Sequence, residues 1–142
     1  MQEDTLAGGC LCGAVRYAVT GPGRLLCYCH CSSCRRATGA PLVPWGTFAR
    51  ERFRVVRGAL AEYRSSPPVL RGFCAGCGTP LTYWNAERPG DLDVALVTLD
   101  AAATLAPLAH VWVSQKLPWV VLQDGLPQYP RGFDSGALAE RA

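Results

Sequence analysis

The sequence predicts a mainly β domain with short helices, and three observations support this. The 142 residues include 15 glycines and 11 prolines, which is typical of many turns and short elements. Several short stretches alternate apolar and polar residues, as half-buried strands do. All eight cysteines fall into three short groups, which suggests that metal ligands help to hold the chain together. Because 49% of the residues are hydrophobic, one core is expected, with a single domain over residues 1–133 and a loose tail over residues 134–142.

Turn residues separate the predicted elements. The expected strands cover residues 14–20, 24–31, 42–49, 59–64, 80–85, 92–99 and 110–114. The strand over residues 59–64 is expected to form a hairpin with the preceding segment, in which Arg50, Arg52 and Arg54 share one face. A short helix is expected after residue 31, capped by Ser32 or Ser33, and residues 118–122 are expected to form a short helix or strand.

Positive charge is concentrated in the first half of the chain. Residues 5–72 hold ten arginines and two acidic residues, whereas residues 73–142 hold four cations and seven acids. Arginine binds carboxylates in a two-pronged geometry, so this half favours a small anionic ligand. The alternative is a solvated surface with a compositional bias toward arginine.

The sequence argues against a membrane span and against export. The apolar run over residues 92–113 contains Asp93, Asp100, Pro107 and His110, which a membrane helix does not tolerate. The chain begins Met-Gln-Glu-Asp, without the basic and apolar regions of a signal peptide, so a reducing cytoplasm is expected. There, cysteine pairs are metal ligands rather than disulfides; an upstream start that encoded a signal would reverse this interpretation.

The spacing of the cysteines predicts zinc. Thiolates two and three residues apart suit a tetrahedral zinc ion. The pair Cys10 and Cys12 cannot close a tetrahedron alone, and neither can Cys74 and Cys77; joined, the two pairs make a four-cysteine site. The central group of residues 27–34 leaves a position that water, an incoming thiol or Cys27 could take. The eight thiols can be divided between two zinc ions in several ways.

Four motifs carry a resemblance to a known family. The stretches GGCLCGAVRY, CHCSSCRRATGAP, FCAGCGTPLTY and HVWVSQKLPWVVLQDGLPQYP resemble the glutathione-dependent formaldehyde-activating enzyme (GFA) family, which shares its domain with centromere protein V. The resemblance covers about residues 8–130. It implies a β-tent fold of antiparallel sheets and two zinc ions per chain. It also implies carbon–sulfur lyase chemistry on the adduct of a thiol and formaldehyde, such as S-hydroxymethylglutathione.

The resemblance also implies roles for individual residues. It assigns a structural zinc to Cys10, Cys12, Cys74 and Cys77, and a second, catalytic zinc to Cys29, Cys31 and Cys34.

Other roles are inferred from the residues themselves. A three-thiolate zinc with an open position can favour the thiolate form of an incoming thiol. Arg35 and Arg36 are candidates to bind the carboxylates of glutathione, and Trp119 is the candidate pocket aromatic. His30 is expected to face away from the metal, where it would support the ligands or face solvent rather than act as a ligand; a role as general acid or base is a further possibility.

Two alternative functions depend on the role of Cys27. Three roles are open to this residue: a buried free cysteine, a fourth ligand that closes the second site, or a redox-active thiol. A closed site favours a non-catalytic zinc module that binds a protein or nucleic acid, and a reactive Cys27 favours a thiol redox sensor. A sequence pI near 8.5 and the absence of a recognition motif argue against nucleic acid.

Overall fold

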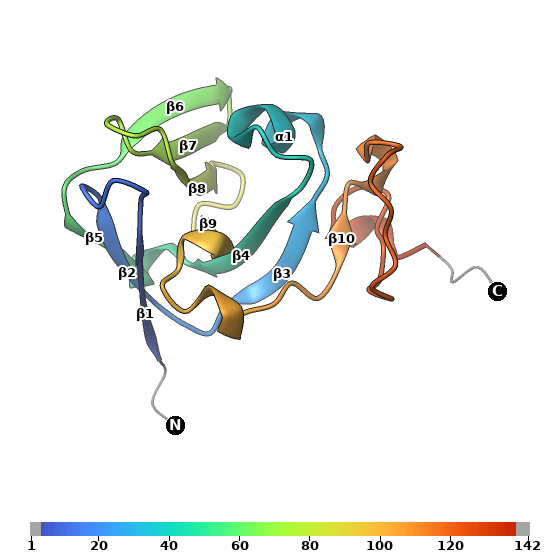
Figure 1. The fold of residues 1–142 in the computed structure, drawn as a ribbon, viewed down its shortest axis with the longest axis horizontal. Coiled ribbons are helices and arrows are strands. Elements are labelled where there is room, and N and C mark those ends of the chain that lie inside the picture. Colours follow the sequence, from blue (N-terminus) through green and yellow to red (C-terminus); the bar gives the residue numbers. More distant parts are fainter. Residues whose placement is uncertain (1–3, 139–142) are drawn as a thin grey trace.

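The short alternating segments fold into strands that form two sheets, in a computed structural model that describes residues 4–138 (Figure 1). The strands are β1 (Thr5–Gly9), β2 (Arg16–Thr20), β3 (Arg24–Cys29), β4 (Val43–Ala49), β5 (Phe53–Arg57), β6 (Ala61–Ser66), β7 (Val69–Phe73), β8 (Pro80–Asn85), β9 (Asp91–Ala95) and β10 (His110–Val111). The helical elements are α1 (Ser32–Thr38) and the 3-10 turns η1 (Arg50–Arg52), η2 (Leu96–Thr98), η3 (Ala102–Thr104), η4 (Val113–Gln115) and η5 (Phe133–Ser135). The predicted mainly β class with short helices is confirmed.

Each of the two sheets combines strands that lie far apart in the sequence. The smaller sheet has the order β1-β2-β5, and the larger has the order β10-β3-β4-β9-β8-β7-β6. The paired strands are antiparallel, except that β10 runs parallel to β3. Since β10 is only two residues long, the larger sheet is in effect an antiparallel sheet with a short parallel edge.

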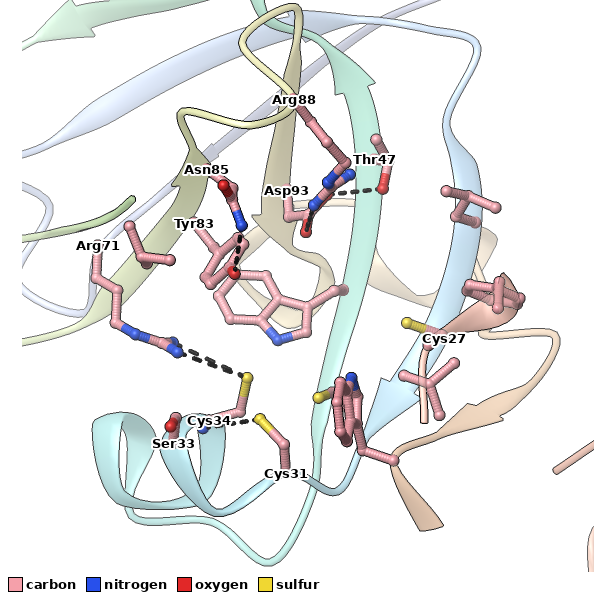
Figure 2. Close-up of a pocket in the computed structure, with 18 of the residues that line it drawn as sticks. Cys27, Cys31, Ser33, Cys34, Thr47, Arg71, Tyr83, Asn85, Arg88 and Asp93 are labelled. Atoms are coloured by element: carbon pink, nitrogen blue, oxygen red, sulfur yellow. Dashed lines mark hydrogen bonds and ion pairs between the residues drawn. The ribbon is translucent and has the colours of Figure 1, made fainter. Parts of the chain in front are cut away.

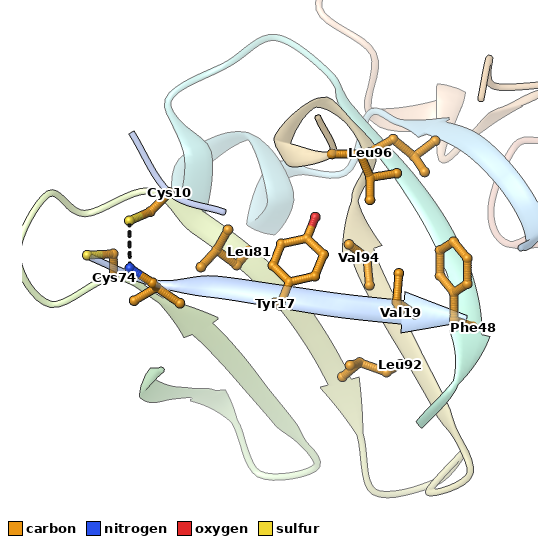
Figure 3. Packing of buried hydrophobic residues seen from close by; sticks show 11 residues of the cluster. Cys10, Tyr17, Val19, Phe48, Cys74, Leu81, Leu92, Val94 and Leu96 are labelled. Carbon is orange, nitrogen blue, oxygen red and sulfur yellow. Dashed lines mark hydrogen bonds between the residues drawn. The ribbon is translucent and has the colours of Figure 1, made fainter. Parts of the chain in front are cut away.

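The main core lies where β2 packs against the larger sheet (Figure 3). Its fully buried apolar side chains include Tyr17, Val19, Phe48, Leu81, Val94 and Leu96. Burying a side chain of this size contributes roughly 1.5–3 kcal/mol, so this layer supplies most of the apolar stabilisation. Cys10 and Cys74 belong to the same cluster, which places one group of thiols at the edge of the core.

Several predicted elements are wrong in their partners or limits. Residues 50–52 form the turn η1, where the chain passes from the larger to the smaller sheet, so Arg50, Arg52 and Arg54 do not share a strand face. The strand β6 pairs with β7 rather than with β5, because β5 joins β2 in the smaller sheet.

The later strands are shorter than predicted. The strand β9 ends at Ala95, and residues 96–98 turn as η2, while β10 comprises only His110 and Val111. Residues 118–122 form neither helix nor strand. Apolar runs predict burial well, but they do not show where a backbone must bend around a small core.

The helix α1 is capped by a cysteine rather than by a serine. Its N-cap is Cys31, whose sulfur accepts a hydrogen bond from the backbone N–H of Cys34 at 3.3 Å. Gly39 ends the helix in the left-handed conformation, with φ of 70°. The cap therefore brings two sulfur atoms together at the first turn of the helix.

The C-terminal segment, residues 112–138, lies beside β3 and β10 (Figure 1). Its backbone is tied to β10 at both ends of His110: the His110 N–H donates to the carbonyl of Pro127, and the Tyr129 N–H donates to the carbonyl of His110, each at 2.8 Å. The Leu138 N–H donates to the Gln128 carbonyl. Residues 139–142 of the predicted loose tail lie outside the described residues, and that prediction stays a prediction. Between residues 4 and 138, no helix has the length and apolarity that crossing a bilayer requires.

Candidate metal centres

The first candidate centre joins two turns that are distant in sequence. Cys10 and Cys12 follow β1, while Cys74 and Cys77 form the turn between β7 and β8. Their four sulfur atoms lie within 4.8 Å of one another. The sulfur–sulfur distance is 3.6 Å between Cys10 and Cys12 and 3.8 Å between Cys12 and Cys74. A tetrahedral zinc with bonds of about 2.3 Å separates its sulfur ligands by about 3.8 Å, so this four-thiol group fits such an ion.

Hydrogen bonds to sulfur stabilise the thiolate form at this four-thiol group. The Val15 N–H donates to the sulfur of Cys10 at 3.2 Å, and the Cys77 N–H donates to Cys74 at 3.4 Å. The Thr79 hydroxyl lies 3.2 Å from the sulfur of Cys77, and the hydrogen bonds from Thr79 lower the pKa of Cys77 to about 5. Because metals bind the deprotonated thiol, these donors favour metal binding.

The second candidate centre is a group of three thiols at the junction of β3 and α1. Cys29 is the last residue of β3, Cys31 caps α1 and Cys34 lies in its first turn; their sulfur atoms lie within 4.8 Å of one another. Hydrogen bonds with the Cys29 and Cys34 thiols lower the pKa of Cys31 to about 2, whereas hydrogen bonds with the Cys31 and Cys34 thiols raise the pKa of Cys29. One thiolate is thus stabilised even before a metal is considered, and the group could hold a metal with a fourth ligand from elsewhere.

The three thiols line a pocket of about 820 Å³ (Figure 2). Opposite the thiols, β7 and β8 contribute Arg71 and Tyr83, and β9 contributes Asp93. Trp112 and Phe133 of the C-terminal segment complete the lining. A ligand in this pocket would contact sulfur on one side and polar side chains on the other.

The polar wall includes a partly buried carboxyl group, that of Asp93. The Thr47 hydroxyl donates to Asp93 at 2.7 Å, and Arg88 donates to the same carboxyl group at 3.4 Å. Burial raises the pKa of Asp93, although both hydrogen bonds oppose that rise. A carboxyl group with a raised pKa in a pocket is a candidate to exchange protons with a ligand.

A chain of hydrogen bonds lies behind the three thiols. Asp124 accepts from Nε2 of His110 at 2.7 Å, which leaves Nδ1 of His110 to accept from Nε2 of His30 at 2.9 Å. Both imidazoles are buried, and burial lowers the pKa of His30 to about 4, so this ring is neutral near pH 7. The Nδ1 atom of His30 has no hydrogen-bond partner among the described residues.

Cys27 lies outside the three-thiol group. It is 7% exposed and packs in a second apolar cluster with Val43, Trp45 and Val111. Burial raises its pKa to about 12. Within residues 4–138, the thiols close enough to share a metal at this centre are those of Cys29, Cys31 and Cys34. Cys27 lines the pocket as a neutral thiol.

The predicted substrate-binding residues are not gathered at the pocket. The Nε of Arg35 donates to the carbonyl oxygen of His30 at 3.3 Å, which places the Arg35 side chain beside the thiol loop, residues 29–31. Arg36 lines a neighbouring cavity of about 700 Å³, together with Tyr63 and Phe73. Trp119 is 69% exposed and lines neither cavity.

Sequence reasoning missed the polar wall of the pocket. Arg71 and Asp93 occur in strands whose patterns predict only burial, and nothing near them in the sequence marks a ligand. The one available signal was position, because Arg71 lies three residues before Cys74. Using it would have required knowledge that β7 faces α1.

A family model and a curated relative name the same family, and a solved structure has a similar fold. The family model described as glutathione-dependent formaldehyde-activating enzyme matches residues 5–115, a stretch that contains all eight cysteines. A Halomonas elongata protein that carries the provisional name of a glutathione-dependent formaldehyde-activating enzyme is 27% identical over 127 residues, covering 83% of this chain and 81% of the relative. The crystal structure of a Rhodobacter sphaeroides protein is similar with a TM-score of 0.58 and 31% identity, covering 67% of this chain and 88% of that one.

Proposed function

The chain belongs to the glutathione-dependent formaldehyde-activating enzyme family, and from this premise we propose that it is a zinc-dependent carbon–sulfur lyase. The proposed substrate is a small thiol–aldehyde adduct such as S-hydroxymethylglutathione. The observation that carries the proposal is the group of three thiols that lines a pocket, with Cys27 outside the group. A fourth cysteine ligand would have closed this centre.

Two zinc ions per chain are part of the proposal. The four-thiol group has the sulfur spacing of a closed structural site, and it would hold one ion between the turn after β1 and the turn after β7. Cys29, Cys31 and Cys34 would hold the other. Catalytic zinc sites commonly have three protein ligands and one exchangeable position, which matches the second group in ligand number.

The proposed reaction balances without a redox partner. The sulfur of the thiol forms a bond to the carbon of formaldehyde, and the thiol proton moves to the aldehyde oxygen; the reverse reaction breaks the same carbon–sulfur bond. Zinc bound at the three thiols supplies Lewis acidity that favours the thiolate form of an incoming thiol. Asp93 is placed to exchange the proton, since its carboxyl group lines the pocket and has a raised pKa.

The pocket suits a ligand of the size of a tripeptide. Its volume of about 820 Å³ lies within the usual range of small-molecule sites. Arg35 and Arg36 remain proposed carboxylate-binding residues, because both lie on α1 next to the thiols. Trp119 would reach a ligand only if residues 117–120 approached the pocket on binding, and its role stays a prediction.

The alternative functions have less support. A closed zinc module would need a fourth thiol at the central group, and Cys27 lies outside it. A redox sensor needs a reactive thiolate, whereas burial raises the pKa of Cys27 to about 12. We further propose a cytoplasmic setting, where a reducing environment would keep eight free thiols available for metal.

The test combines metal analysis with a solution assay of the adduct. Two zinc equivalents per chain are expected, one of them with three sulfur ligands and one lighter ligand by X-ray absorption. Exchange between glutathione, formaldehyde and their adduct, followed by NMR, should be faster with the protein than without it, and Cys34→Ser should abolish the acceleration. Equal exchange rates with and without the protein would reject this substrate pair.

A further inference from the structure

Arg71 points its guanidinium group at the three-thiol centre (Figure 2). Both terminal nitrogens, Nη1 and Nη2, lie 3.9 Å from the sulfur of Cys34. The Nε atom donates to the hydroxyl of Ser65 at 3.1 Å, and the guanidinium carbon lies 5.0 Å from the centre of the Tyr83 ring. These contacts fix the group in orientation. No carboxylate is among these partners in residues 4–138, so this positive charge is directed at sulfur.

The other arginine of the pocket lining is engaged elsewhere. Among the described residues, Arg71 and Arg88 are the cations that line the pocket. Arg88 lies 3.4 Å from the carboxylates of both Asp91 and Asp93. Its charge is therefore compensated locally. The charge of Arg71 is available to the thiol group and to whatever ligand enters beside it.

Charge counting shows why such a cation is needed. A divalent metal with three thiolates has a net charge of −1, and an additional thiolate ligand would raise this to −2. Cys29 and Cys34 are about as buried as core residues, and an uncompensated charge there is costly. The four-thiol group includes the exposed Cys12 and has water to stabilise its charge. The buried centre has Arg71 instead.

We infer that Arg71 is the counter-ion of the three-thiol centre and makes its open position selective for anionic sulfur ligands over neutral ones. The ligand class is a small thiolate, of which glutathione is one example. This inference rests on the proposed metal at Cys29, Cys31 and Cys34. A purely structural role for Arg71, in packing β7 against α1, would not make the centre distinguish ligands by charge. Charge selectivity therefore separates the two roles.

The test measures ligand binding rather than turnover. The protein is loaded with Co²⁺, whose visible absorption reports a change of ligand, and is titrated with 2-mercaptoethanol, glutathione or neutral imidazole. The four-thiol site contributes a constant background, because it has no open position. An opposite charge within about 4–6 Å stabilises the charged form of a group by about 10–1000-fold, so Arg71→Gln should weaken thiolate binding by about tenfold or more. Imidazole binding should change by less than about threefold.

Two further variants separate charge from packing. Arg71→Lys keeps the positive charge while removing the planar fork, and it should retain most of the preference for thiolate. Arg64→Gln removes the same charge from the neighbouring strand β6, where Arg64 donates to the Pro67 carbonyl, and should bind both ligands as the unchanged protein does.

Each outcome has a distinct meaning. Equal losses of thiolate and imidazole in Arg71→Gln would mean that Arg71 is structural and would overturn the inference. Unchanged thiolate binding in Arg71→Gln would overturn the inference alone and leave the proposed function standing. Failure of the unchanged cobalt protein to bind any thiol would reject both.

Discussion

Nε2 of His30 and Nδ1 of His110 lie 2.9 Å apart in the interior of the protein. His30 lies between two thiols of the candidate metal centre, Cys29 and Cys31, and His110 begins the short strand β10. Because Asp124 accepts from the other nitrogen of His110, three residues connect the thiol loop to the C-terminal segment. The backbone around Cys29 and Cys31 is therefore supported by His110 and Asp124, which lie 80 and 94 residues after His30 in the sequence.

The first prediction concerns the outer end of this hydrogen-bond chain. Asp124→Ala leaves the buried Nε2–H of His110 without its acceptor, which should lower the free energy of unfolding by about 1–3 kcal/mol. Asp124→Asn should recover most of this loss, since the amide oxygen can accept the same hydrogen bond. Urea denaturation measures the difference, with Asp134→Ala as a control at an exposed carboxylate. Equal losses in Asp124→Ala and Asp134→Ala would contradict the prediction.

The second prediction separates the two candidate metal centres. Cys74→Ser breaks the four-thiol group, which joins residues 62 positions apart, so it should remove one metal equivalent and destabilise the fold by several kcal/mol, on the order of a structural metal site. Cys34→Ser should also remove one equivalent but leave the far-ultraviolet circular dichroism unchanged. Metal analysis and thermal melting measure both effects. If the two variants melt at the same temperature, the division into structural and catalytic centres is wrong.

The third prediction tests the role of Cys27. Cys27→Ala should leave the metal content at its original value, because the sulfur of Cys27 lies outside both groups of thiols. The loss of a buried sulfur should cost about 1 kcal/mol of stability. Metal stoichiometry and urea denaturation provide the two readouts. A fall of one metal equivalent would identify Cys27 as a ligand instead.

The cysteine groups could be predicted from sequence because their information is local. Cys29, Cys31 and Cys34 lie within six residues, and a strand end followed by one helical turn brings their sulfur atoms close to one another. Strand positions were likewise local, as in β2, where alternation marks Tyr17 and Val19 as buried. Local pattern thus predicted the fold class and the thiols.

What could not be predicted depends on partners across the fold. Alternation in residues 53–57 shows that a strand exists, but not that it pairs with β2 rather than with β6. Arg71 meets Cys34 only because β7 lies beside α1, and no spacing in the sequence encodes that approach. The close approach of β7 and β8 has a subtle mark in Gly72, where a Cβ atom would collide with the Thr82 hydroxyl, but a lone glycine does not identify its neighbour.

The last prediction uses the raised pKa of Asp93. Burial raises this pKa above its ordinary value, so the folded state holds a proton on Asp93 more tightly than the unfolded chain does. The stabilisation from this group is present at low pH and is lost as the pH rises through the raised pKa.

Asparagine cannot ionise, so the free energy of unfolding of the unchanged protein should fall relative to Asp93→Asn as the pH rises from about 4 to about 7. Taking the difference between the two proteins removes the pH dependence of the two thiol groups, which both proteins contain. Urea denaturation at several pH values measures how this difference in the free energy of unfolding changes with pH, with Asp134→Asn as the control for an exposed carboxylate. If the unchanged protein instead gained stability relative to Asp93→Asn as the pH rose, the hydrogen bonds from Arg88 and Thr47 would outweigh burial, and Asp93 would be an ordinary ion-paired carboxylate.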